Sequence, residues 1–178
     1  MLMKTPWLIP SEALNRPLNR QTDDLILVSE EATETIRRLG FHIGNIGLLI
    51  AQHATSELTE MKQVCTIPFT APWLVGLINL RGNLVPVFDL NMLMQLPRRT
   101  EQKQMLLILG QGESAGAIVI EDLPIHLTFT TADKLETLPP LPPVLKPFAT
   151  SGYEKKGEVW FNFDHLGFFE SLTTKIAV

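Results

Sequence analysis

The hydrophobic pattern from Phe41 onward predicts a chain built of short strands. The segment "FHIGNIGLLIA" (41–51) has an apolar run on each side of Gly44-Asn45, a dipeptide typical of a two-residue hairpin turn. Similar short runs follow, separated by turn signals roughly every 8–12 residues, so that about nine or ten strands are expected. This pattern is typical of an all-β barrel or sandwich. The clearest later runs are residues 105–109, 115–120, 125–130 and 159–163.

The segment before these strands has a different character. "SEEATETIRRLG" (29–40) begins with a serine that can cap a helix, has acidic residues in its first turn and ends with two arginines and a glycine. These features predict a short surface helix. We therefore expect residues 1–38 to form a partly helical N-terminal extension, followed by a strand-rich domain over residues 39–178.

A cationic side chain interrupts the most hydrophobic hairpin, "GLINLRGNLVPVFDL" (76–90). Gly82 suits a tight turn there, with Arg81 beside it at the tip. Pro86 cannot donate to a sheet ladder, so the second strand is expected to lie at an edge or a bulge. A guanidinium held at such a tip presents five donors in fixed directions. Arg81 therefore either bonds carbonyls of a neighbouring part of the chain or anchors a partner.

Three further segments complete the organisation. "LNMLMQL" (90–96) predicts a short amphipathic helical turn, and "DHLGFFESL" (164–172) predicts a second one that begins at the capping residue Asp164. The proline-rich stretch 131–149 disfavours both helix and sheet and predicts a semi-rigid connector.

Composition narrows the class of protein. The chain has 178 residues, 45% hydrophobic and 19% charged, which is typical of a globular protein. Its net charge of −4 argues against a surface specialised for nucleic acid. The single cysteine, Cys65, excludes a disulfide framework within the chain and fits a reducing cytoplasm. The longest apolar runs are far below the roughly 20 residues of a membrane-spanning helix.

A search for catalytic chemistry finds no familiar motif. No two histidines are spaced as metal ligands, and "GQGESAG" (110–116) matches neither a nucleophile elbow nor a dinucleotide-binding loop. We therefore expect a binding module with no catalytic residues, metal or cofactor. Two alternatives stay open: a small nucleic-acid-binding barrel, and an enzyme with an unfamiliar site built on His53, Glu57 and Arg81.

A family resemblance rests on several of these segments. "IPFTAPWLVGLINLRGNLVPVFDL" (67–90) closely resembles the signature of the CheW-like family, the coupling proteins of bacterial chemotaxis arrays. Residues 41–50 resemble the opening hairpin of the family, 117–123 resemble a strand of its second lobe, and 153–166 resemble its closing hairpin and helix. The resemblance covers about residues 39–172.

The resemblance implies a fold of two small five-stranded β-barrels packed together, with short helical turns. It also implies a non-catalytic adaptor that links the cytoplasmic tips of chemoreceptors (methyl-accepting chemotaxis proteins) to a CheA-type histidine kinase. Such a protein is cytoplasmic, is recruited to membrane-bound receptor arrays and does not insert into the membrane. The extended N-terminus resembles the family variants that serve type IV pilus (twitching) systems.

The same resemblance suggests where partners bind. In the family, receptors use the groove between the lobes and the region of the Arg-Gly turn, and the kinase-facing surface lies on the first lobe. The partner-binding residues expected here are Glu57, Leu58, Asn79, Leu80, Arg81 and Gly82.

Overall fold

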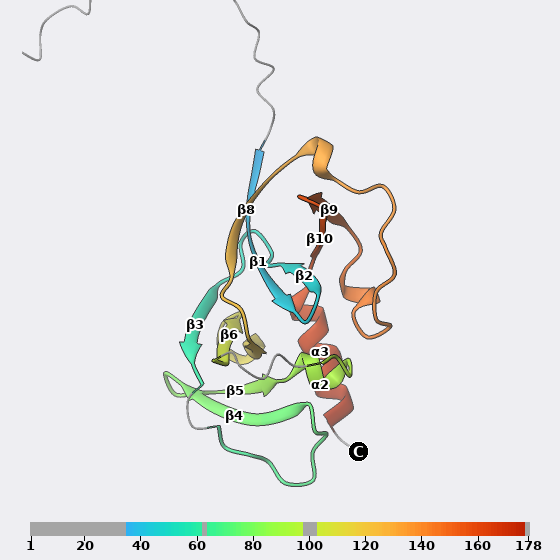
Figure 1. Cartoon of the computed structure of the whole chain (residues 1–178). Coiled ribbons are helices and arrows are strands. Elements are labelled where there is room, and N and C mark those ends of the chain that lie inside the picture. Colours follow the sequence, from blue (N-terminus) through green and yellow to red (C-terminus); the bar gives the residue numbers. More distant parts are fainter. Residues whose placement is uncertain (1–34, 62–63, 98–102, 177–178) are drawn as a thin grey trace, which may run out of the picture. The chain divides into compact units, whose positions relative to one another are not determined.

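The computed structural model describes residues 35–61, 64–97 and 103–176, which belong to one unit, Thr33–Val178. Its strands form two five-stranded sheets (Figure 1). The first, here called sheet A, has the order β8-β1-β2-β10-β9. Its strands are β1 (Thr35–Ile43), β2 (Ile46–Leu49), β8 (Ile125–Thr130), β9 (Gly152–Lys155) and β10 (Glu158–Asn162).

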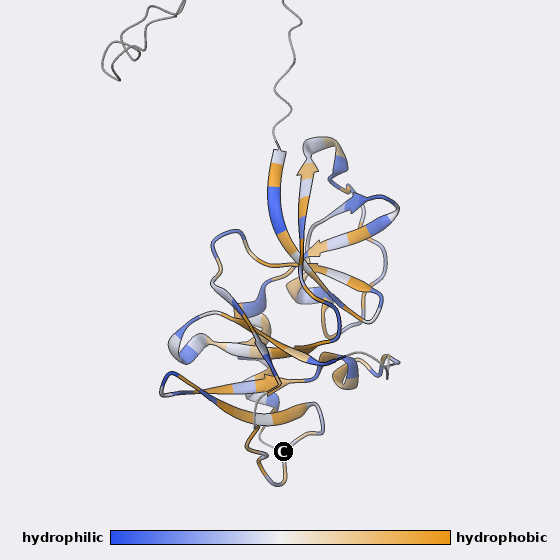
Figure 2. Ribbon diagram, turned by 60° about the vertical axis from the view of Figure 1, so that its left-hand side comes forward, coloured by the Kyte–Doolittle hydropathy of each residue, from blue (hydrophilic) through white to orange (hydrophobic). Residues whose placement is uncertain are grey.

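The middle of the chain forms the second sheet, here called sheet B, with the order β3-β6-β7-β5-β4. Most residues of these strands are hydrophobic (Figure 2), and β6 and β7 are buried along nearly their whole length, because both sides of these two strands face a hydrophobic cluster. The strands are β3 (Ser56–Glu60), β4 (Leu74–Leu80), β5 (Asn83–Phe88), β6 (Met105–Leu109) and β7 (Gly116–Ile120).

Each sheet curls until its two edges meet. In sheet B, Cys65, which follows edge strand β3, exchanges backbone hydrogen bonds of 2.8 and 2.9 Å with Leu77 of the other edge strand, β4. In sheet A, Lys134, which follows β8, forms a single bridge with Tyr153 of β9. The expected pair of five-stranded units is thereby confirmed, and each is closed by one isolated bridge rather than by a full ladder.

Three hydrophobic clusters stabilise this arrangement. Burial of large apolar side chains contributes about 1.5–3 kcal/mol per residue, which makes such clusters the main stabilising element of a fold this size. The interior of sheet A is filled by Leu49, Phe129, Tyr153 and Trp160, and that of sheet B by Ile78, Val85, Val87, Leu106, Ile108, Ala115, Ala117 and Val119. The third and largest cluster takes residues from both sheets and the last helix, including Phe41, Leu48, Phe88, Leu107, Phe161 and Phe168.

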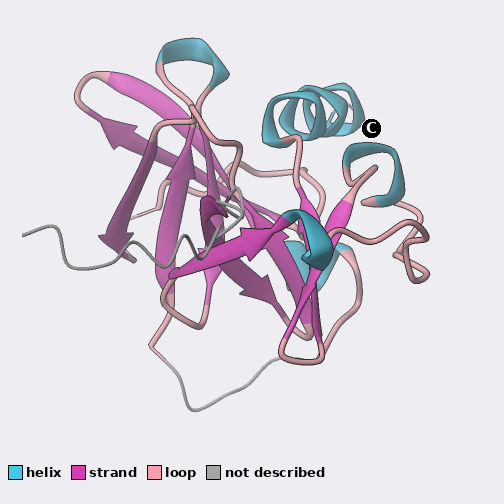
Figure 3. Cartoon of the chain, turned by 90° about the horizontal axis from the view of Figure 1, so that it is seen from above, coloured by secondary structure: helices cyan, strands magenta, loops and turns pink. Residues whose placement is uncertain are grey.

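Two helices follow corresponding hairpins of the two sheets. Helix α2 (Leu90–Leu93) follows β5, and Asp89 caps it by accepting a 2.9 Å hydrogen bond from the Met92 N–H. Helix α3 (His165–Ile176) follows β10, and Asp164 accepts a 3.1 Å hydrogen bond from the Gly167 N–H. Figure 3 shows α3 as a coil of several turns to one side of the strands. Single 3-10 turns, η1 (Gly112–Ser114), η2 (Thr131–Asp133) and η3 (Lys146–Phe148), complete the fold.

The helix predicted over residues 29–40 is wrong where it can be checked. Residues 35–40 belong to β1, which pairs with β8 from Thr35↔Thr130 to Gly40↔Ile125. The Arg38 guanidinium, expected to favour a helix end, instead donates to the Ile50 carbonyl at 2.9 and 3.2 Å. The ladder with β8 and the Arg38 hydrogen bonds outweigh the weak local preference for helix. The boundary expected between residues 38 and 39 therefore falls inside a strand, while residues 29–34 lie outside the described part of the chain.

Pro86 leads us to expect the second strand of the hairpin, now β5, at a sheet edge or a bulge, and the expectation of an edge is wrong. Strand β5 is not an edge strand, because it pairs with β4 on one side and β7 on the other. The pairing with β7, however, consists of Val87↔Ala117 and Phe88↔Ile118 and begins directly after the proline. The missing N–H of Pro86 thus coincides with the point where one ladder ends.

Other predictions from the sequence agree with the fold. The turn at Gly44-Asn45 joins β1 to β2, the short helix after Asp89 is present, and residues 139–147 contain neither strand nor α-helix. Helix α3 is longer than predicted and continues to Ile176. Within the described ranges, no helix combines the length and the apolar character needed to cross a membrane.

Candidate functional site

The turn between β4 and β5 holds Arg81 at the edge of sheet B. Arg81 and Gly82 both have left-handed backbone conformations, with φ of 52° and 89°, and the register closes with Leu80 opposite Asn83. Two positive φ values are what a type I′ hairpin turn requires, and glycine meets that requirement at low cost. The Asn79 side chain stabilises the turn by accepting a 2.9 Å hydrogen bond from the Gly82 N–H.

The Arg81 side chain reaches across to the opposite edge of the sheet. Its Nη2 lies 2.9 Å from Oε2 of Glu57, which belongs to β3. Strands β3 and β4 stand at the two ends of the sheet order, so only the curling of the sheet brings these charges together. The Arg81 side chain is 78% exposed and that of Glu57 is 35% exposed. An ion pair so open to water contributes little to stability, and its donors stay accessible to a partner.

A cavity of about 340 Å³ lies next to this pair. Glu57, Leu80 and Arg81 line it, together with residues of the β6–β7 connection. The floor is apolar and the rim is polar, a combination that suits binding of another molecule. The complete lining is Thr55, Glu57, Leu80, Arg81, Asn83, Val85, Ile108, Gly110, Gln111, Gly112 and Ala115.

The expected partner-binding residues do not all share this site. Glu57, Leu80 and Arg81 meet at the cavity, and Asn79 and Gly82 shape the turn that holds the arginine. Leu58 follows Glu57 directly along β3 and is absent from the cavity lining. Successive strand residues face opposite sides of a sheet, so Leu58 presents its 40% exposed side chain on the other face.

Other lining residues were missed by sequence reasoning. The Gln111 amide donates a 2.7 Å hydrogen bond to the Thr55 hydroxyl, which ties the β6–β7 connection to the start of β3. The glycines around Gln111 indicate only a hairpin connection when considered by themselves. Gly110 has a φ of 84° and Gly112 a φ of 57°, which fits that role. No local pattern links this turn to Arg81, because their proximity depends on closure of the sheet.

The residues suggested for an enzyme site do not converge. Glu57 and Arg81 line the first cavity, whereas His53 lines a different one, of about 440 Å³, together with His165. His165 is buried, and this burial lowers the pKa of its imidazole, with a smaller opposing effect from the charge of Asp164. Among the described residues, no group of three or more His, Cys, Asp or Glu side chains is arranged to hold a metal ion.

Comparison with known proteins gives concordant matches. The model of the CheW-like domain matches residues 37–172. Protein PilI of Pseudomonas aeruginosa is 26% identical over 150 residues, which cover 79% of this chain and 83% of PilI. The crystal structure of the scaffolding protein TtCheW from Thermoanaerobacter tengcongensis superimposes with a TM-score of 0.59 at 18% identity. The match covers 72% of this chain and 83% of TtCheW, and at that identity it supports the fold.

Proposed function

The chain belongs to the CheW-like domain family, and from this premise we propose that it is a non-catalytic adaptor that couples chemoreceptors to a CheA-type histidine kinase. Receptor binding uses the surface around the Arg81–Glu57 pair. The kinase binds a separate surface, which by the family resemblance lies on the first lobe. In this role the protein works in the cytoplasm at membrane-bound receptor arrays.

The observation that carries this proposal is the exposed cation at a rigid turn. Arg81 stands on a two-residue turn braced by Asn79 and beside a cavity with a partly apolar lining. A partner that offers an acceptor gains charge-assisted hydrogen bonds from a guanidinium already held in place by Glu57. Little ordering of the adaptor is then needed on binding, which favours recognition.

We also propose that the coupled system drives type IV pilus (twitching) motility. Two observations support this assignment. The first is the N-terminal segment that precedes the matched residues 37–172 and resembles the extension of the pilus-system variants. The second is the similarity to Protein PilI, which extends over 79% of the chain.

Calorimetric titration with each partner separately tests the proposed role of Arg81. Arg81→Ala removes the cation, and Arg81→Asn removes it with a residue that tolerates the left-handed turn. Either change is expected to weaken binding of a receptor cytoplasmic fragment by about 1–3 kcal/mol, the range for a lost charged hydrogen bond. Binding of the kinase is expected to change less.

The matched control is Lys156→Asn. Lys156 precedes Gly157 in the corresponding turn of sheet A and has nearly the same φ, 54°. This variant loses the same charge from the same kind of turn and should bind the receptor fragment normally. Equal losses in the two variants would show that net charge, not the site, governs binding. An unfolded Arg81→Asn protein, or one with unchanged receptor affinity, would show that the arginine has a structural role only.

A further inference from the structure

A second groove lies away from the Arg81–Glu57 pair, between α3 and the β5/η1 region. It has a volume of about 410 Å³ and shares only Ala115 with the first cavity. Pro86 and Ala115 form one side, and Leu166 and Phe169 of α3 form the other. Because it contains neither Arg81 nor Glu57, a role for this groove is independent of the proposed receptor site.

The apolar floor of the groove follows from the local packing. Phe169 is buried and stacks on Phe88 of β5 with ring centroids 5.4 Å apart. The β5–β7 ladder begins only at Val87, so Pro86 has no partner on the side of β7. The floor is therefore fixed by the core, and its shape does not depend on a partner.

One stripe of α3 lines the groove. Leu166, Glu170 and Thr173 are spaced i, i+4 and i+7, which places them on one side of a helix. Leu166 is 49% exposed although it is a large apolar residue at the groove. Together with the Phe169 ring, this leucine gives the groove an apolar wall that a partner's apolar side chain can contact.

Charge restricts what this groove can accept. Two exposed carboxylates, Glu113 of η1 and Glu170 of α3, stand among the lining residues, and the lining contains no lysine or arginine. The whole chain carries a net charge of −4. An apolar ligand with basic groups at its flanks is attracted by this rim, whereas an anionic membrane surface or nucleic acid is repelled.

We propose that this groove docks a basic amphipathic helical segment of a protein partner. An apolar side chain of the segment packs on Phe169 and Leu166, and its flanking lysines or arginines pair with Glu113 and Glu170. Binding of this kind uses the helix-in-groove mode, in which apolar anchors give affinity and rim charges give selectivity. The surface adds a partner site to the one proposed at the Arg81 turn.

Titration of the full chain with designed peptides tests the proposal. The probe is a 14-residue fluorescent peptide with leucines on one helical face and lysines on the other, and its counterpart carries glutamates in place of the lysines. Fluorescence anisotropy is expected to show binding of the lysine peptide and no binding of the glutamate peptide. The double variant Glu113→Gln/Glu170→Gln should weaken binding about fivefold, since two exposed ion pairs are lost. Leu166→Ser should weaken it by a similar factor, because apolar contact is lost.

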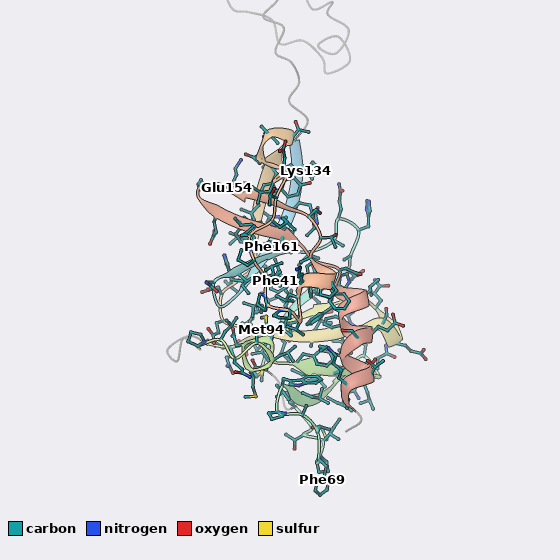
Figure 4. All side chains as sticks on the ribbon, turned by 90° about the vertical axis from the view of Figure 1, so that its right-hand side faces the viewer. Phe41, Phe69, Met94, Lys134, Glu154 and Phe161 are labelled. Atoms are coloured by element: carbon teal, nitrogen blue, oxygen red, sulfur yellow. The ribbon has the colours of Figure 1, made fainter. Side chains whose placement is uncertain are left out.

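Matched controls separate docking from general attraction. Glu136→Gln/Glu154→Gln removes the same charge from exposed positions outside the groove, and Leu123→Ser replaces a 63% exposed leucine outside it. In Figure 4, Glu154 lies on sheet A, far from the later turns of α3. Both controls should bind the lysine peptide normally, and Arg81→Asn should do so too. The proposal is overturned by equal weakening in the controls, by equal binding of the two peptides, or by no binding at millimolar peptide.

Discussion

Sheet A and sheet B follow the same path through their strands. From one edge to the other, each has two antiparallel pairings, one parallel pairing and a final antiparallel pairing. The parallel pairs are β2–β10 in sheet A and β7–β5 in sheet B. The chain order is permuted between them. In sheet B, the strands occur along the chain in the order β3, β4, β5, β6 and β7. The strands at the equivalent positions of sheet A are β8, β9, β10, β1 and β2, so its last two equivalents come first in the chain.

The correspondence extends to the turns and helices. Lys156-Gly157 in sheet A matches Arg81-Gly82 in sheet B, each with two positive φ values. The helix that follows begins after a capping aspartate in both sheets. The two sheets thus share their strand arrangement, their hairpin turn and the cap of the helix that follows.

Each sheet has an ion pair that joins its two edges, Lys155–Asp133 in sheet A and Arg81–Glu57 in sheet B, and the two pairs differ in their surroundings. In sheet A, Asp133 accepts hydrogen bonds from the Thr130 N–H at 2.6 Å, the Thr130 hydroxyl at 3.1 Å and the Lys155 ammonium at 3.2 Å. The backbone N–H of Thr130, with help from Lys155, lowers the pKa of the Asp133 carboxyl despite opposing desolvation. In sheet B, the cation of the pair across the edges, Arg81, stands one position further into its turn than Lys155 does and is 78% exposed. The pair in sheet A is built into a turn, whereas the pair in sheet B faces outward.

Exposed apolar residues are also unevenly distributed. Among the residues that the structure describes, most of the large exposed ones belong to sheet B or the segments that join its strands, and only Ile125 lies on a strand of sheet A. Phe69, between β3 and β4, is fully exposed and protrudes at the far end of sheet B (Figure 4). Sheet B and its connections therefore expose more apolar surface than sheet A does. The exposed residues associated with sheet B are Leu58, Met61, Ile67, Phe69, Leu84 and Met92.

The largest expected effect comes from shortening β1. Deleting residues 1–38 removes Thr35–Arg38, which supply four of the six β1–β8 pairs, and also removes the Arg38 bonds to Ile50. We expect a loss of about 3 kcal/mol or more, seen as a melting temperature lower by about 10 °C. Deleting residues 1–34 leaves β1 intact and is the control. If the two truncated proteins melt alike, the Thr35–Arg38 part of β1 does not stabilise sheet A.

The next largest loss of stability is expected from substituting one of two glycines. Gly76 and Gly152 each precede a residue of an isolated bridge that closes a sheet, Leu77 in sheet B and Tyr153 in sheet A. A Cβ on Gly76 would lie 2.3 Å from the Cys65 carbonyl oxygen, and the residue has a φ of +148°. A Cβ on Gly152, at the corresponding place in sheet A, would lie 2.9 Å from the Trp160 oxygen, and its φ is not positive. Gly76→Ala should cost about 3 kcal/mol, from overpacking and backbone strain together, and Gly152→Ala about 1 kcal/mol.

Urea unfolding of the two alanine variants measures this difference. A larger loss in Gly152→Ala would mean that the closing bridge of sheet A, not that of sheet B, is the more tightly packed. Unchanged stability in Gly76→Ala would show that the Cys65–Leu77 bridge can open without cost.

The smallest effect concerns the two ion pairs. Glu57→Gln should change stability by less than about 1 kcal/mol, as is usual for exposed pairs. Asp133→Asn should destabilise the protein more. Because the folded-state pKa of Asp133 is lowered, its stabilisation is fully present above the unfolded pKa of about 3.9 and is lost as pH falls through the folded value.

Chemical denaturation at several pH values between 7 and 2.5 measures the difference in the free energy of unfolding between Asp133→Asn and the parent protein, here called the stability gap. The gap should be constant near neutral pH and should close at the acid end. A gap that does not depend on pH would mean that the carboxylate charge is not what stabilises the turn.

Local patterns in the sequence determined much of this protein. The hairpins at Gly44-Asn45 and Arg81-Gly82, the caps at Asp89 and Asp164 and the all-β class each depend on residues close together in the chain. The sequence also contains a short repeat. Arg81-Gly82 and Lys156-Gly157 are both followed, six and seven residues after the glycine, by Phe-Asp.

Only the tertiary structure decided the rest. The charges of residues 29–40 predict a helix, but Thr35–Gly40 form a strand because β8, which is about 90 residues later in the chain, pairs with all six of these residues. Arg81 was a candidate from the sequence, as was Glu57, yet their 2.9 Å contact exists because sheet B closes on itself. Thr55 and Gln111 join the same cavity for the same reason. Turns and caps are governed by neighbouring residues, whereas strand pairing and sheet closure depend on contacts between residues far apart in sequence, which no local pattern encodes.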